Sequence, residues 1–174
     1  MIKFLRRLLG QGSTNNRHDQ TRHRLEAAKQ AALQPTLYAQ WGVPDTFDGR
    51  FEAVLLMVCV DFARLNRDGD APSADALLAA FMEDVELALQ ASGVSEGGMR
   101  KKMRAVETSC FARVERIGGP LRAQASTVEE ITNSMFGAQE DTAGTAAKLD
   151  TLLHRLYASE RGIEAASAVV EEMS

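Results

Sequence analysis

Residues 51–65 read FEAVLLMVCVDFARL, and this stretch decides the class of fold. Apolar side chains recur in it at the spacing of one helical face, at Phe51, Val54, Leu55, Val58, Phe62 and Leu65. The other faces of its middle are also apolar, because they carry Leu56, Met57, Cys59 and Val60. A helix that is apolar on every side is buried among other elements. We therefore predict that residues 51–65 form the central helix of the domain.

The residues before this helix, QWGVPDTFDGR at 40–50, hold the only tryptophan of the chain. Gly42, Pro44 and Asp45 favour a turn, and Asp48 or Gly49 can cap the start of the helix. Nothing in this turn argues for catalysis. We interpret it as the entrance to the buried helix, and we expect Trp41 to be packed rather than free.

Composition predicts an all-α protein that forms a single compact multi-helix domain. The 174 residues are 45% hydrophobic and 25% charged, with only four prolines, and helix-forming residues recur throughout. No alternating strand pattern is evident. Further helices are expected at about 17–33, at 37–41, from a Ser73 cap toward Gly93, at 99–117, from a Thr127–Glu130 capping box to Phe136, and over two C-terminal apolar stretches. Gly118, Gly119 and Pro120 are expected to end the helix at 99–117.

The first ten residues, MIKFLRRLLG, predict a short basic amphipathic helix that ends at Gly10. We expect QGSTNN at 11–16 to be a linker, which divides the chain into a segment 1–16 and a helical domain 17–174. The segment either lies in a membrane interface or packs on the domain. The residues expected at a membrane surface are Lys3, Phe4, Leu5, Arg6, Arg7, Leu8 and Leu9.

Targeting and membrane signals in the sequence are weak. The N-terminal composition is also typical of a mitochondrial presequence, but it lacks the apolar core and the cleavage site of a secretory signal. The longest apolar run, residues 53–60, is far shorter than the roughly 20 residues of a membrane-spanning helix. We therefore predict contact with a membrane surface at most.

Charge is distributed unevenly along the chain. Residues 1–30 carry seven Lys or Arg and two acids, residues 95–125 carry seven and three, and residues 126–174 carry three and nine. Basic regions favour anionic partners such as a membrane surface, RNA or a ribosome. The alternative for each region is a solvated helix face.

The sequence offers no recognisable catalytic constellation. His18, His23 and His154 have no partners at zinc-ligand spacing, and there is no nucleophile elbow, phosphate loop or dinucleotide fingerprint. Cys59 and Cys110 each follow a helical apolar periodicity, which is typical of buried free thiols. We therefore expect no metal and no cofactor, and a binding role rather than an enzyme.

The stretch WGVPDTFDGRFEAVLLMVCVDFARLNRDG at 41–69 resembles the start of the ubiquinol–cytochrome c chaperone family. The shared features are an aromatic, a Pro-Asp turn, a Gly-Arg-Phe entry and an Arg-Leu end, here Trp41, Pro44-Asp45, Gly49-Arg50-Phe51 and Arg64-Leu65. The family pattern continues in FMEDVELALQASGV at 81–94, RKKMRAVE at 100–107 and Phe111–Arg113, so the resemblance covers about residues 36–120. Two departures are Met57–Cys59, where relatives often carry His, and Ala112 in place of Gly.

The resemblance implies a non-enzymatic assembly factor for ubiquinol–cytochrome c reductase (complex III). Its expected partners are newly made cytochrome b or complex III assembly intermediates, an anionic membrane surface, and a ribosome or a small partner subunit, with no specific DNA binding. The alternative function is a peripheral membrane adaptor that has no respiratory client.

The Ala-rich composition favours a bacterial member of the family over a mitochondrial one. The resemblance then implies a location on the cytoplasmic face of the bacterial inner membrane, with the matrix side of the mitochondrial inner membrane as the alternative. The predicted partner-binding residues are Trp41, Pro44, Asp45, Arg50, Arg64, Arg100, Lys101, Lys102, Arg104 and Arg113.

Overall fold

The computed structural model describes residues 2–137 and 142–174, with side chains described from residue 17 onward apart from Glu96. Every regular element in this part of the chain is helical, which confirms the predicted all-α class. The elements are α1 (Ile2–Ala32), α2 (Pro35–Ala39), α3 (Phe47–Arg67), α4 (Ala71–Ala91), α5 (Glu96–Ala123), α6 (Val128–Ile131), a π-helical turn (Thr132–Phe136), α7 (Ala143–Ala158), a 3₁₀ turn (Gly162–Ala165) and α8 (Ala166–Glu172).

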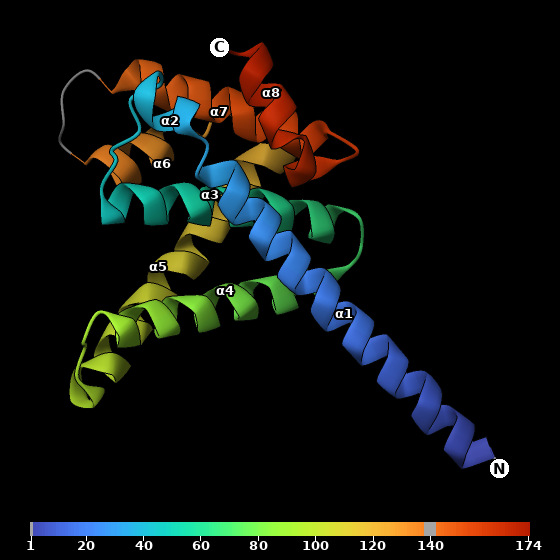
Figure 1. The fold of residues 1–174 in the computed structure, drawn as a ribbon. Helices are drawn as coiled ribbons and strands as arrows, with labels where there is room; N and C mark the ends of the chain where they lie inside the picture. Colours follow the sequence, from blue (N-terminus) through green and yellow to red (C-terminus); the bar gives the residue numbers. More distant parts are fainter. Residues whose placement is uncertain (1, 138–141) are drawn as a thin grey trace.

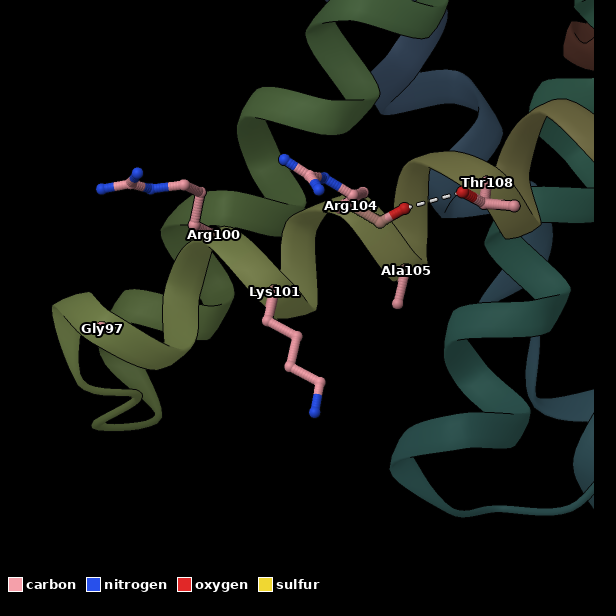
Figure 2. A pocket seen from close by; sticks show the side chains of 6 residues that line it. All are labelled: Gly97, Arg100, Lys101, Arg104, Ala105 and Thr108. Carbon is pink, nitrogen blue, oxygen red and sulfur yellow. Dashed lines mark hydrogen bonds between the residues drawn. The ribbon is translucent and has the colours of Figure 1, made fainter.

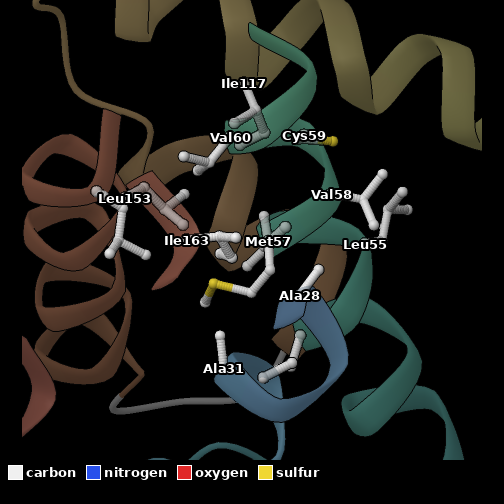
Figure 3. Close-up of a cluster of buried hydrophobic side chains, with 14 of the residues drawn as sticks. Ala28, Ala31, Leu55, Met57, Val58, Cys59, Val60, Ile117, Leu153 and Ile163 are labelled. Carbon is white, nitrogen blue, oxygen red and sulfur yellow. The ribbon is translucent and has the colours of Figure 1, made fainter. Parts of the chain in front are cut away.

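Helix α3 runs through the middle of the molecule, and α1, α4, α5 and α7 all pack against it (Figure 1). Residues 55–60 have no exposed surface at all. Met57 and Val60 point toward one side of α3, and Leu55, Val58 and Cys59 point toward the other (Figure 3). Each large apolar side chain that is buried in this way contributes about 1.5–3 kcal/mol. The prediction of a central buried helix is confirmed.

The start of α3 differs from the prediction by one turn. The helix begins at Phe47, and the hydroxyl of Thr46 accepts a hydrogen bond from the backbone N–H of Gly49 at 3.1 Å. The caps expected at Asp48 or Gly49 are therefore wrong. Gly49 is needed for another reason, because a Cβ there would lie 2.1 Å from the carbonyl oxygen of Pro44.

Two other predicted caps are also wrong. Asp70, not Ser73, caps α4, because its carboxylate accepts the backbone N–H of Ser73 at 3.2 Å. The capping box at Thr127 does not form, since the Thr127 hydroxyl instead donates to Asp150 of α7 at 2.7 Å. The Thr127 hydroxyl thus bonds to a distant side chain, Asp150, instead of to the backbone of its own helix, and this hydrogen bond links α6 to α7.

Helix α1 is continuous where the sequence predicted a break. The expected end at Gly10 and the linker at 11–16 both fall inside the helix Ile2–Ala32. An interior glycine costs only about 1 kcal/mol relative to alanine, and no proline precedes Pro35, so nothing in the backbone forces a stop. The division of the chain at residue 16 stays a prediction.

Helix α5 also continues through its predicted end at Gly118, Gly119 and Pro120, as far as Ala123. Ile117 and Leu121, on either side of these residues, are fully buried, so tertiary packing offsets the cost of an interior proline, about 3 kcal/mol. The helix ends where Gln124 adopts a left-handed backbone conformation with φ of 53°.

Two parts of the molecule extend beyond the core on the same side and diverge from one another (Figure 1). One is the N-terminal half of α1. The other, which we call the hairpin arm, is residues 82–109, from the end of α4 and the start of α5. No described residue of the hairpin arm is buried. These projections contrast with the packed region around α3.

Candidate partner-binding surfaces

Trp41 lies in the core and not on the surface. Its side chain is 4% exposed, and its carbonyl oxygen accepts a hydrogen bond from the hydroxyl of Thr145 in α7. The ammonium of Lys148 lies 6.0 Å from the centre of the indole ring. The prediction that Trp41 is packed is confirmed, and its burial argues against the expected direct contact with a partner.

Arg64 is a structural residue rather than a surface one. Its guanidinium donates to the carbonyl oxygens of Ser159 and Glu160 at 2.9 and 3.0 Å, just beyond the end of α7. It also pairs with the fully buried carboxylate of Asp61 at 3.4 Å. Arg64 is only 7% exposed, and its guanidinium is already bound to these carbonyl oxygens and to Asp61. The prediction that Arg64 contacts a partner is therefore corrected.

Arg113 is likewise held inside the fold. Its guanidinium lies 3.0 Å from the carboxylate of Glu52 in α3 and also binds Glu130 in α6. Burial raises the pKa of Glu52, and the charge and hydrogen bond of Arg113 only partly oppose this effect. Arg113 therefore joins α3, α5 and α6, and its side chain, 11% exposed, offers little to a partner. This is a second correction to the expected contact residues.

Asp45 and Arg50 are exposed and lie together on one open groove. The Arg50 Nε donates to the Asp45 carboxylate at 2.6 Å, and this hydrogen bond is the main reason that the pKa of Asp45 is lowered. The Arg50 guanidinium also lies 5.8 Å from the centre of the Tyr38 ring. The groove has a volume of about 440 Å³, and we call it the turn groove; its lining residues are Leu33, Pro35, Tyr38, Ala39, Asp45 and Arg50.

Two large apolar side chains are exposed in or near the turn groove. Leu33, in its lining, is 46% exposed, and Phe47, two residues from Asp45 in the chain, is 71% exposed. Pro44, another predicted contact residue, is half-buried at the same turn. Exposed apolar side chains beside a polar rim are typical of protein-binding sites. The turn groove is therefore a candidate contact surface.

The basic segment, defined as Arg100, Lys101, Lys102 and Arg104, is exposed on the hairpin arm. Arg100 and Arg104 point to one side of α5, whereas Lys101 points to the other (Figure 2). The hollow of about 710 Å³ beside them is lined, among the described residues, by α5 alone. It is thus the open flank of a single helix rather than a cleft. None of the four cations takes part in an ion pair between described side chains.

The predicted membrane-surface residues, from Lys3 to Leu9, lie outside the described side chains. The backbone places them in the first turns of α1, which extend away from the other helices (Figure 1). This placement argues against the alternative in which the segment packs on the domain. Contact with a membrane stays a prediction.

The described part of the chain holds no obvious reaction centre. Cys59 and Cys110 are buried free thiols, as predicted. Burial raises the pKa of both, that of Cys110 to about 11, so neither is a thiolate nucleophile at neutral pH. Among these residues no group of three or more His, Cys, Asp or Glu could hold a metal ion. No described helix is both long enough and apolar enough to cross a bilayer.

Grooves with exposed apolar side chains and exposed cations on a helical core are typical of a protein that binds other molecules. The comparisons with known proteins agree with this class. The model of the family described as ubiquinol–cytochrome c chaperone matches residues 39–173, and the chain therefore belongs to that family. It is a non-catalytic assembly factor with a role in complex III assembly.

The chain is also similar to the crystal structure of the Cbp3 homolog from Brucella abortus, with a TM-score of 0.74 and 22% sequence identity. The similarity covers 95% of this chain and 94% of that one, and it shows a shared fold. Comparison with curated protein sequences gives no match. The resemblance seen over residues 36–120 is thus confirmed, and the family match continues nearly to the C-terminus.

Sequence reasoning missed the apolar half of the turn groove. Leu33 lines the groove just after the last residue of α1. Phe47 continues the apolar face of α3, four residues before Phe51, but it is the first residue of the helix and is 71% exposed. Their exposure follows from how α1, α2 and α3 meet. The spacing of Phe47 from Phe51 and Val54 predicts a buried side chain, so periodicity gave no signal of its exposure.

Proposed function

We propose that this chaperone acts on newly made cytochrome b at a membrane surface during complex III assembly. The observation that carries the proposal is the family match over residues 39–173. The client would be a membrane protein whose apolar segments need cover before assembly. A helical protein with exposed grooves suits that task, because an amphipathic or apolar helix can lie in such a groove.

The turn groove is our proposed client contact. Its apolar side chains can cover part of a client helix, and the Asp45–Arg50 pair can hydrogen-bond polar groups at the edge of that helix. Of the predicted contact residues in this region, Pro44, Asp45 and Arg50 are retained and Trp41 is not, since it is buried.

Attachment to the membrane is proposed through the first turns of α1. Lys3, Arg6 and Arg7 would meet anionic headgroups, and the apolar face of the same helix would enter the interface. Each basic residue contributes about 1 kcal/mol near an anionic surface. The proposed location is the cytoplasmic face of a bacterial inner membrane, with the matrix side of the mitochondrial inner membrane as the alternative.

The proposal is tested by deleting the gene in its natural host and measuring assembled complex III and cytochrome b. Both are expected to fall, and the native gene is expected to restore them. Normal amounts of both would reject the proposal. Capture of the tagged chain from native membranes should enrich cytochrome b, whereas enrichment of unrelated membrane proteins alone would favour an adaptor.

The role of the turn groove is tested by returning Leu33→Ser or Arg50→Ala to the deletion strain. Each is expected to restore less complex III than the native gene. Arg67→Ala is a matched control, since Arg67 also pairs with a neighbouring acid, Asp68, at 2.8 Å and lies 4.9 Å from the ring of Tyr157. Equal rescue by Arg50→Ala and Arg67→Ala would mean that the groove is not the contact surface.

A further inference from the structure

The hairpin arm leaves several apolar side chains partly or wholly uncovered. Over residues 82–109 no described residue is buried, although several apolar side chains are half-buried and Leu87 is 59% exposed. Isolated helices of this length are marginally stable in water and gain most of their stability from a packed apolar face. The arm is therefore suited to having its apolar seam covered by another molecule. The half-buried apolar side chains that do not pack against the core are Leu89, Val94, Met99 and Met103, whereas Met82, Val85 and Val106 contact it.

A groove of about 420 Å³ lies along this seam, between α4 and α5. We call it the seam groove; its lining residues are Glu86, Met99, Arg100, Met103, Arg104 and Glu107. Methionine side chains are flexible and polarisable, so they adapt to the apolar face of a bound helix. Arginines stand beside them in the same groove and can form hydrogen-bonded pairs with carboxylates.

The charges of the seam groove indicate the kind of molecule that fits it. The basic segment favours an anionic partner, and its cations take part in no ion pair between described side chains. Glu86 and Glu107 line the same groove, and an anionic bilayer or a nucleic acid would repel them. A protein helix can place acidic side chains at the arginines and polar ones at the glutamates.

We propose that the seam groove receives an amphipathic helix of a partner protein. Its apolar face lies on Met99 and Met103, and acidic side chains at its edge pair with Arg100 and Arg104. The inference rests on the proposed function only in that a chaperone has protein partners. Its test uses purified protein in solution, so its outcome does not depend on complex III.

The test measures binding of the full chain to a synthetic helical peptide with leucine along one face and glutamate at its edges. The variants are the double replacement Arg100→Glu with Arg104→Glu, and Met99→Gln with Met103→Gln. Each double variant is expected to weaken peptide binding about tenfold or more. The arginine replacements remove the pairing with the acidic side chains of the peptide, and the methionine replacements remove the contact with its apolar face. Helix content by circular dichroism should be unchanged, since none of these residues is buried.

The matched control is Lys101→Glu with Lys102→Glu, which changes the net charge by the same amount outside the seam groove. It is expected to weaken peptide binding less than threefold, or about 0.6 kcal/mol. A peptide with lysine in place of glutamate should bind at least about tenfold more weakly. Equal losses for the arginine and lysine pairs would overturn the proposal in favour of general charge attraction. So would tighter binding to phosphatidylglycerol vesicles or to single-stranded RNA than to the peptide.

Discussion

Gly162 lets the guanidinium of Arg64 lie directly against the backbone after α7. Its φ is +57°, and a Cβ at this position would lie 1.5 Å from Nη1 of Arg64. Two separate requirements, a left-handed backbone conformation and the absence of a side chain, therefore meet at one residue. The contact of Arg64 with this backbone links the segment after α7 to the central helix α3.

We expect Gly162→Ala to lower the free energy of unfolding by about 3 kcal/mol, measured by urea denaturation. The cost combines backbone strain with displacement of Arg64 from the carbonyls that it binds. Gly93→Ala is the control, since Gly93 has φ of +79° with nothing near its missing Cβ. Strain alone should cost about 1 kcal/mol there. Equal costs for the two variants would show that the Arg64 contact is not tight.

Asp61 is a second residue on which the fold depends. Its carboxylate is fully buried between Arg24 at 3.2 Å and Arg64 at 3.4 Å. Asp61→Asn should cost about 3 kcal/mol, because it leaves the buried charge of Arg64 without its partner. Thermal or urea unfolding measures this cost. Asp68→Asn, at an exposed pair with Arg67, should cost less than about 1 kcal/mol, and an equally large effect would contradict the argument.

At the scale of elements, α1 and α4 are joined by a cluster of charged side chains. The Asp84 carboxylate pairs with Arg22 at 2.8 Å and also with Lys29. Partial burial, the largest single influence, acts to raise the pKa of Asp84. The hydrogen bonds and charges of Lys29 and Arg22 together outweigh it and hold the pKa below the usual 3.8. A carboxyl whose pKa is lower in the folded state stabilises the fold above its unfolded pKa, and this stabilisation is lost as the pH falls.

We therefore expect Asp84→Asn to lower the free energy of unfolding at pH 7 by about 1 kcal/mol. The difference from the native chain should close as the pH falls below the usual 3.8, when Asp84 becomes protonated in both states. Urea denaturation at a series of pH values between about 3 and about 7 measures how this difference in unfolding free energy depends on pH. Glu86→Gln, at an unburied position on the same helix, should change stability by less than about 0.5 kcal/mol. A pH-independent gap would contradict the role of the Asp84 charge.

At the scale of the whole molecule, two arms extend from one side of a packed core (Figure 1). One carries the basic start of α1, and the other carries the basic segment of α5. The proposals give them different tasks, membrane contact for α1 and a partner helix for the hairpin arm. This division of tasks can be tested separately from the identity of the client.

Removal of residues 1–10 should release the protein from anionic liposomes at low salt, since it deletes three cations and an apolar face. Liposome sedimentation measures the bound fraction. The variant with Arg100→Glu and Arg104→Glu should sediment nearly as well as the native chain. If the truncated protein binds as before and the arginine variant does not, the membrane contact lies on the hairpin arm.

Composition, helical periodicity and motif order were enough to predict the all-α class, the central helix at 51–65, the burial of Trp41 and both cysteines, and the family. Each depends on local periodicity or on the order of short motifs. A helix that is apolar on every side has no other stable place than the centre, so α3 follows from its residues alone.

Which polar residues are available to a partner depends on how the helices pack together. Arg64, Arg113 and Arg50 look alike in sequence, yet the first two are held by carboxylates and carbonyls inside the fold, whereas Arg50 is exposed on the turn groove. The end of α5 and the cap at Thr127 were decided in the same way, by contacts with distant segments. The free energy of such contacts depends on which helices meet, and local sequence does not encode that directly.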